Sequence, residues 1–170
     1  NVSEVTYKHY EGVGRFWRAY FYYDMVKTFG DVPWYDHELQ STDHEALYKP
    51  RDSREFVMDK VLEDLNFAAQ YCSSDIKVVA SSTKISRWVA LAFKARVCLF
   101  EGTYRKYHVE LGLQSSVNKF LNEAATACET LIQESPYGLV TNGDVKTQYR
   151  SLFTSDDLNT KEVILGVAYK

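Results

Sequence analysis

The chain has 170 residues, of which 45% are hydrophobic and 25% are charged, and its formal net charge is −3. This length and composition are typical of one globular domain with its own core, and they exclude a disordered polypeptide. The acidic balance lacks the basic field that binds phosphate backbones, so we expect no nucleic-acid partner.

The first predicted element is a long helix over residues 5–29. Its apolar residues recur at helical spacing, and Gly30 followed by Pro33 marks its end. Eleven aromatic residues lie between Tyr7 and Tyr35. This number exceeds what the burial of one helix face requires, so some of these rings must lie off the core-facing side.

A polar loop follows this helix and begins with Trp34, Tyr35 and Asp36. Long loops inside compact domains are usually functional or mobile. An exposed indole can stack on the C–H face of a sugar ring, and a neighbouring carboxylate can hydrogen-bond the hydroxyls. We therefore predict these three as ligand-binding residues. The alternative is that Trp34 folds back onto the helix and anchors the loop.

Three further helices are predicted over residues 52–72, 84–105 and 115–134. The third helix is apolar nearly all the way round, which indicates a central, buried position, and Trp88 is expected to belong to the core. Serine or aspartate residues precede each of the three and can cap them. The predicted fold is mainly α, with antiparallel helix pairs typical of tetratricopeptide-like repeats.

The second and third predicted helices carry opposite charge. Glu55, Asp59 and Glu63 form an acidic ladder on the second, whereas the third is mostly basic. Because neighbouring helices of opposite charge attract, we expect this ladder to face Arg87 or Lys94.

The last part of the chain is predicted to form a short helical turn near residues 148–153 and a strand over residues 162–168. A strand without a partner is a poor end for a natural domain. We therefore interpret residues 1–170 as a single helical-repeat domain that is an internal fragment of a longer secreted protein.

The sequence contains no motif for a metal site, a phosphate loop or a catalytic triad. We expect no metal, no cofactor and no enzymatic activity. Cys72, Cys98 and Cys128 have no metal-binding or redox spacing and are predicted to be buried free thiols. No apolar run is long enough to span a membrane.

Three segments occur in the order typical of the SusD/RagB family, and the chain resembles that family: RFWRAYFYYDMVKTFGDVPWYD (15–36), KPRDSREFVMDKVLEDLNFA (49–68) and KISRWVALAFKARVCLFEGTYRKYH (84–108). The resemblance implies a non-enzymatic lipoprotein on the cell surface of a Bacteroidetes outer membrane. It implies capture of an oligosaccharide and its delivery to a SusC-like TonB-dependent transporter. The lipid anchor would lie outside this chain.

Two alternatives to this function stay open: a RagB-like member that binds peptide, and a helical-repeat scaffold that binds only protein. Three interpretations stay open for the surplus rings of the first helix. They can pack against further parts of a longer protein, form a platform for a ligand, or contact the partner transporter.

Three smaller polar features complete the sequence. The segment 51–54 could hold an anion at a helix start, whereas the resemblance implies a cap and an internal ion pair there. His108 is interpreted as a favourable partner of a helix C-terminus. Asp156, Asp157 and Asn159 are interpreted as a turn, because their spacing does not match a calcium loop.

Overall fold

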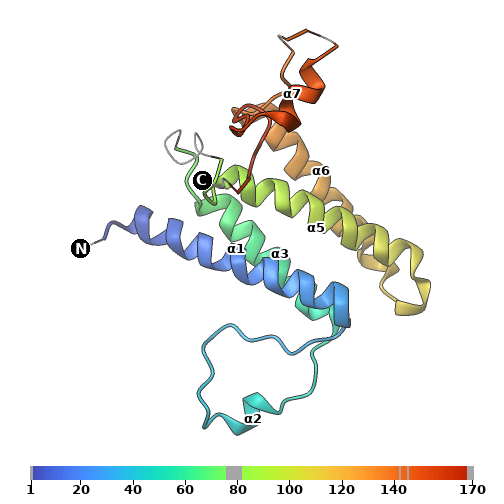
Figure 1. The fold of residues 1–170 in the computed structure, drawn as a ribbon. Coiled ribbons are helices and arrows are strands. Elements are labelled where there is room, and N and C mark those ends of the chain that lie inside the picture. The colour runs from blue at the N-terminus through green and yellow to red at the C-terminus, as the bar shows by residue number, and fades with distance from the viewer. Residues whose placement is uncertain (1, 76–81, 142, 145, 168–170) are drawn as a thin grey trace.

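The computed structural model describes residues 2–75, 82–141, 143–144 and 146–167. In these ranges the chain is mainly α-helical, and no strand is present beyond one isolated antiparallel bridge between Val32 and Asp52. The six α-helices of the described residues are α1 (Glu4–Phe29), α2 (His44–Leu47), α3 (Arg54–Tyr71), α5 (Arg87–Tyr107), α6 (Val117–Glu134) and α7 (Gln148–Thr154) (Figure 1).

The four long helices predicted from the sequence are confirmed, and three of them begin at a serine whose side chain caps the helix. Ser3, Ser53 and Ser86 accept hydrogen bonds from the third residue of α1, α3 and α5. At the other end of α1, Gly30 takes a positive φ of 72° and donates its amide to Val26 O at 3.0 Å. The third helix begins three residues later than predicted, at Arg87.

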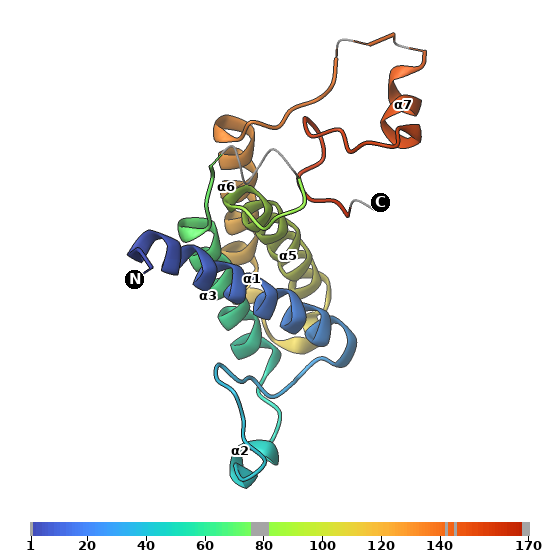
Figure 2. The same ribbon diagram turned by 60° about the vertical axis from the view of Figure 1, so that its left-hand side comes forward.

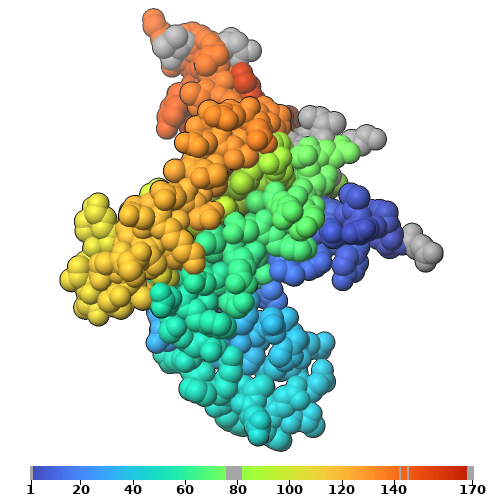
Figure 3. Space-filling view, turned by 180° about the vertical axis from the view of Figure 1, so that it is seen from behind, coloured from blue at the N-terminus to red at the C-terminus, as the bar shows by residue number. Residues whose placement is uncertain are grey.

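The long helices pack as two neighbouring antiparallel pairs, α1 with α3 and α5 with α6, and α3 also contacts α5 (Figure 1). Figure 3 shows α3 between α6 and the N-terminal part of α1 on the rear face. The helices of each pair approach closely at a glycine. A Cβ on Gly102 would lie 2.7 Å from Leu121 Cδ2, so a larger residue there would push α5 and α6 apart.

The core lies where α1, α3, α5 and α6 meet, and its least exposed members include Phe16, Met58, Leu65 and Phe120. Trp88 is 5% exposed and lies in a second cluster with Leu91, Ala95 and Ala127, which confirms its predicted core position. The loop that carries α2 and the segment that carries α7 extend from opposite ends of this bundle (Figure 2).

The predicted strand over residues 162–168 is wrong for its described part. Residues 162–167 form turns and bends, and Ala168 lies outside the described residues. Val163 donates its amide back to Asn159 O at 2.8 Å, and Gly166 donates to Ser82 O at 2.7 Å. Strand-forming residues without a neighbouring strand cannot build a ladder, so this segment instead uses local turns and contacts with the helices.

Two further expectations need correction. Cys72 and Cys98 are buried as predicted, but Cys128 is exposed on α6. Within the loop over residues 31–53, the short helix α2 was not foreseen, because its four residues carry no hydrophobic periodicity. The predicted turn around Asn159 and the short helix near residues 148–153 are both present.

Candidate functional site

Trp34 lies at the base of the loop and faces the helices. It is 7% exposed, its ring lies 4.3 Å from the Tyr22 ring, and the Arg18 guanidinium lies 5.0 Å from its centroid. The sequence left two positions open for this indole, exposed to a ligand or folded back onto the helix, and the structure shows the second, because Tyr22 and Arg18 of α1 cover the ring. The position matches the alternative of an anchor. A ligand contact by Trp34 stays a prediction.

The backbone around Trp34 is fixed by Lys49 and Asp52 from the far end of the loop. The Trp34 amide donates to Asp52 Oδ2 at 2.7 Å, and Lys49 Nζ donates to Trp34 O at 2.6 Å and to Asp52 Oδ2 at 2.7 Å. Desolvation raises the pKa of Asp52, but the hydrogen bonds from Lys49 and the Trp34 amide outweigh it, so this pKa lies below its ordinary value. These bonds close the loop at its base.

Tyr35 and Asp36 lie beside Trp34, so the structure brings the three predicted residues together. The Tyr35 hydroxyl donates to Ala46 O at 2.6 Å, and its amide donates to the Tyr22 hydroxyl at 2.8 Å. Asp36 is exposed, and its hydrogen bond with His37 Nδ1 at 2.7 Å lowers its pKa. Of the three side chains, only the Asp36 carboxylate is open to solvent, while Tyr35 is half-buried.

Arg18 connects this loop base to α3. Its Nε and Nη2 donate to the two oxygens of the buried Asp64 at 2.6 and 2.7 Å, and its Nη1 donates to Asp36 O at 3.0 Å. The hydrogen bond to Asp64 raises the pKa of Arg18. Burial raises the pKa of Tyr22, so its hydroxyl stays neutral beside Tyr35. The loop base is therefore held rigidly to both α1 and α3.

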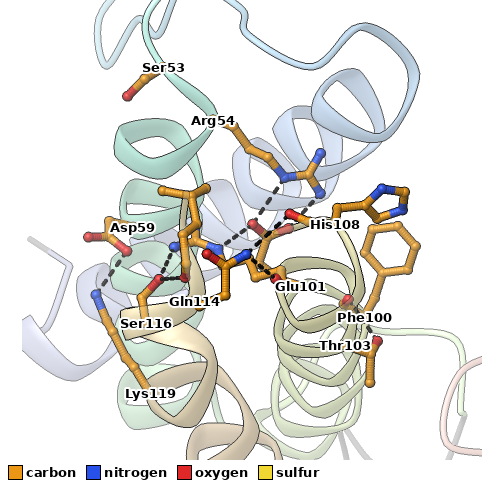
Figure 4. Close-up of polar contacts among 12 residues, drawn as sticks. Ser53, Arg54, Asp59, Phe100, Glu101, Thr103, His108, Gln114, Ser116 and Lys119 are labelled. Carbon is orange, nitrogen blue, oxygen red and sulfur yellow. Dashed lines mark hydrogen bonds and ion pairs between the residues drawn. The ribbon is translucent and has the colours of Figure 1, made fainter. Parts of the chain in front are cut away.

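A buried cluster of two arginines around one carboxylate ties α3 to α5 (Figure 4). Arg54 donates to both oxygens of Glu101 at 3.1 and 2.6 Å, and Arg105 Nε donates to Glu101 Oε1 at 2.7 Å. Arg105 Nη1 also donates to Ser116 Oγ at 2.6 Å. The segment 51–54 thus supplies a helix cap at Ser53 and an internal ion pair at Arg54, as the resemblance implied.

The charge pairing predicted between the second and third helices is wrong. Arg87 and Lys94 both pair with α6, through Glu134 at 3.1 Å and Glu123 at 2.5 Å. Asp59 pairs with Lys119 of α6 at 2.8 Å, whereas Glu63 pairs with Lys60 of its own helix. The prediction failed because Arg87 and Lys94 lie on the side of α5 that faces α6, a packing arrangement that the sequence alone does not determine.

A groove between α1 and α5 was not foreseen from the sequence. It has a volume of about 270 Å³ and is lined by Phe16, Trp17, Tyr20, Val89, Ala92, Phe93, Arg96, Ile164 and Leu165. The i,i+3 spacing of Trp17 with Tyr20 and of Phe93 with Arg96 could have placed each pair on one helix face. The pairing of those two faces follows only from the packing.

Metal sites and membrane-spanning helices are not found among the described residues. These residues contain no group of three or more His, Cys, Asp or Glu side chains arranged for a metal ion. Within the same ranges, every helix is too short or too polar to cross a membrane. His108 ends α5, and its Nδ1 lies 2.8 Å from Glu110 Oε1, in keeping with a role at the helix terminus.

A SusD-like family model, described as "Starch-binding associating with outer membrane", matches residues 1–99. The chain belongs to the SusD-like family. Proteins of this family are typically non-catalytic binding proteins, and the family description associates them with the outer membrane.

Two relatives extend this comparison. The SusD-like protein P38 of Formosa agariphila is 29% identical over 177 aligned positions, which cover 99% of this chain and 30% of that protein. The crystal structure of a SusD-like protein from Bacteroides fragilis aligns with a TM-score of 0.73 and 27% identity, over 100% of this chain and 29% of that one. The chain thus spans about 30% of the length of the relatives it matches.

Proposed function

We propose that this chain is the helical-repeat part of a longer cell-surface protein that binds oligosaccharide at the outer membrane without chemical conversion. The observation that carries the proposal is its membership of the SusD-like family, with a family match over residues 1–99 and a fold match over the whole chain. The antiparallel pairs α1–α3 and α5–α6 would be tetratricopeptide-like units.

Under this proposal, the longer protein is lipid-anchored at the cell surface, and it delivers its ligand to a SusC-like TonB-dependent transporter. Binding relies on shape, aromatic stacking and hydrogen bonds. Trp34, Tyr35 and Asp36 are the proposed ligand-binding group. Given the burial of Trp34, direct contact with ligand would fall to Asp36 and the exposed edge of Tyr35, with Trp34 holding them in place.

The rigid loop base supports this division of roles. Recognition sites work best when their side chains are fixed before the ligand arrives, because less conformational entropy is then lost on binding. Tyr35 is held by Tyr22 and Ala46, and the Asp36 backbone is held by Arg18. A polar group on a fixed loop base is suited to orient sugar hydroxyls.

A glycan array probed with the longer protein that contains this chain tests the proposal, and a peptide array runs in parallel. The expected result is binding to a defined set of oligosaccharides, which are recovered unchanged in mass afterwards. Binding to peptides alone would replace the proposal with the RagB-like alternative. Binding to neither array would leave only a protein scaffold, and cleaved products would reveal an enzyme.

The transporter step has its own test. This chain, immobilised, is exposed to detergent-solubilised outer membranes of a bacterium that carries a SusC-like transporter, and captured proteins are identified by mass spectrometry. Enrichment of that transporter over unrelated outer-membrane proteins is the expected result. Equal recovery of transporter and unrelated proteins would contradict this part of the proposal.

A further inference from the structure

The groove between α1 and α5 presents a fixed aromatic wall. The Tyr20 ring stacks on Phe93 at a centroid distance of 5.2 Å and an angle of 27°, and Trp17 meets Tyr20 edge-on at 5.6 Å. Trp17 is 50% exposed and Tyr20 is 49% exposed. Their packing holds both rings in place, while the outer surface of Trp17 stays open for a second flat or C–H-rich partner.

One end of this groove carries an excess of positive charge. A second hollow of about 130 Å³ adjoins it, shares Tyr20, Phe93 and Arg96, and adds Tyr23, Asp24 and Lys27. Lys27 pairs with Asp24 at 2.9 Å, which balances those two charges. Arg96 is exposed and has no hydrogen-bond or ion-pair partner among the residues described. An open guanidinium favours an anionic occupant, and its planar fork fits a carboxylate.

The size of the groove limits what can enter. Its volume of about 270 Å³ lies just below that of most ligand pockets, which measure about 300–1,000 Å³. It therefore suits a single ring. The lining is apolar along Trp17, Val89 and Ala92 and ends at Arg96, so the occupant needs an apolar face with one acidic group at its edge.

We propose that this groove binds one hexuronate unit of an acidic oligosaccharide. The C–H face of the sugar stacks on Trp17, and its carboxylate pairs with the Arg96 guanidinium. This inference rests on the proposed oligosaccharide-binding function and gives it a ligand class and a second contact surface. The groove is separate from the loop base, because none of Trp34, Tyr35 and Asp36 lines it.

Calorimetric titration of the chain with trigalacturonate is the central experiment, with maltotriose as the neutral sugar and triglutamate as the acidic peptide. We expect trigalacturonate alone to bind. Trp17→Ala should weaken that binding about 5- to 150-fold, on the scale known for stacking on aromatic side chains. Arg96→Gln should weaken it at least about tenfold and reduce its salt dependence.

Matched controls come from the same surface. Phe21→Ala removes another exposed ring of α1 that lies outside the groove, and Arg51→Gln removes another exposed arginine. Neither should change the affinity. Trp17→Phe keeps an aromatic face and should retain most of the binding, which separates loss of stacking from loss of fold. Circular dichroism melting curves verify that each variant is folded.

Tryptophan fluorescence gives an independent measurement. Trp34 and Trp88 are 7% and 5% exposed, so acrylamide quenching reports mainly on Trp17. Saturating trigalacturonate should protect the emission from the quencher, whereas maltotriose should not.

Each contrary result has a defined meaning. If oligosaccharides bind the chain but the Trp17 and Arg96 variants bind equally well, this inference is overturned and the proposed function stands. If no oligosaccharide on the glycan array binds, the proposed function fails as well. Equal affinity for maltotriose would remove the acidic specificity, and Trp17-dependent binding of triglutamate would assign the groove to acidic peptides instead.

Discussion

Arg54 on α3 and Glu101 on α5 form a two-point ion pair inside the helix bundle, with N–O distances of 3.1 and 2.6 Å. Arg54 is 7% exposed and Glu101 is fully buried. Two charges removed from water cost free energy that their attraction must offset, and good geometry decides the balance. The second arginine, Arg105, makes the carboxylate the shared centre of three elements, since it also bonds Ser116 beside α6.

We predict that Glu101→Ala destabilises the fold by about 3–5 kcal/mol, because it leaves two buried guanidiniums without their carboxylate. Urea denaturation followed by circular dichroism measures the change. Glu129→Ala on the exposed face of α6 is the control, and it should shift the unfolding free energy by less than about 0.5 kcal/mol. A similar stability of both variants would mean that the pair contributes nothing.

The loop base gives a second prediction. Trp34→Ala should lower the free energy of unfolding by about 3–5 kcal/mol, because the ring is buried against Tyr22 and Arg18. Trp17→Ala, which removes a half-exposed ring of the same kind, should cost clearly less. The comparison uses the same urea titration. A parent-like melt for the Trp34 variant would show that the indole is dispensable to the loop.

The sequence was sufficient for the long helices, because the hydrophobic period of each and the serine caps of α1, α3 and α5 are local signals. It was also sufficient for Trp88, which lies within a helix that is apolar nearly all the way round. It did not decide between an exposed and a buried Trp34, because the exposure of a loop residue depends on partners such as Tyr22 and Asp52 that the chain brings close only on folding.

The partners of Lys94 show the same limit. Helix charge predicted an ion pair with α3, yet Lys94 lies on the side of α5 that meets Glu123 of α6. The acidic residues of α3 and of α6 are equally suitable partners for Lys94. The rotation of α5 about its axis decides which of them Lys94 meets, and the packing of the whole core sets that rotation. The groove lined by Trp17 and Arg96 was not predicted for the same reason, because it depends on which faces of α1 and α5 meet.

Acid stability should depend on Asp52. Its pKa is lower in the folded chain than in the unfolded one, so its contribution is fully present above about pH 4 and is lost as the pH falls through the folded value. Asp52→Asn should therefore reduce stability at pH 7 and flatten the loss of stability on acidification. Thermal melts between about pH 7 and 2 measure both effects. An unchanged pH profile in the variant would contradict the role given to the carboxylate.

The three thiols should react at very different rates. Burial raises the pKa of Cys72 to about 11 and that of Cys98 to about 12, so both are almost entirely protonated at pH 8, whereas Cys128 is exposed. A thiol reagent such as DTNB should titrate one fast group per folded chain. Cys128→Ser should abolish this fast phase, and denaturant should restore reactivity at the other two. More than one fast thiol in the folded parent would contradict the assignment.

The bonds that join Trp34 to Lys49 and Asp52 have a consequence for how this protein can diversify. They hold the two ends of the loop over residues 31–53 together, so the packing of α1 against α3 does not depend on how many residues lie between those ends. Lengthening such a closed loop costs little, because each doubling of its length adds only about 0.6 kcal/mol to the entropic cost of loop closure. Residues 37–48 can thus be exchanged, shortened or extended between related proteins while α1 and α3 keep their register. Selection can act on that tip independently of the bundle beneath it.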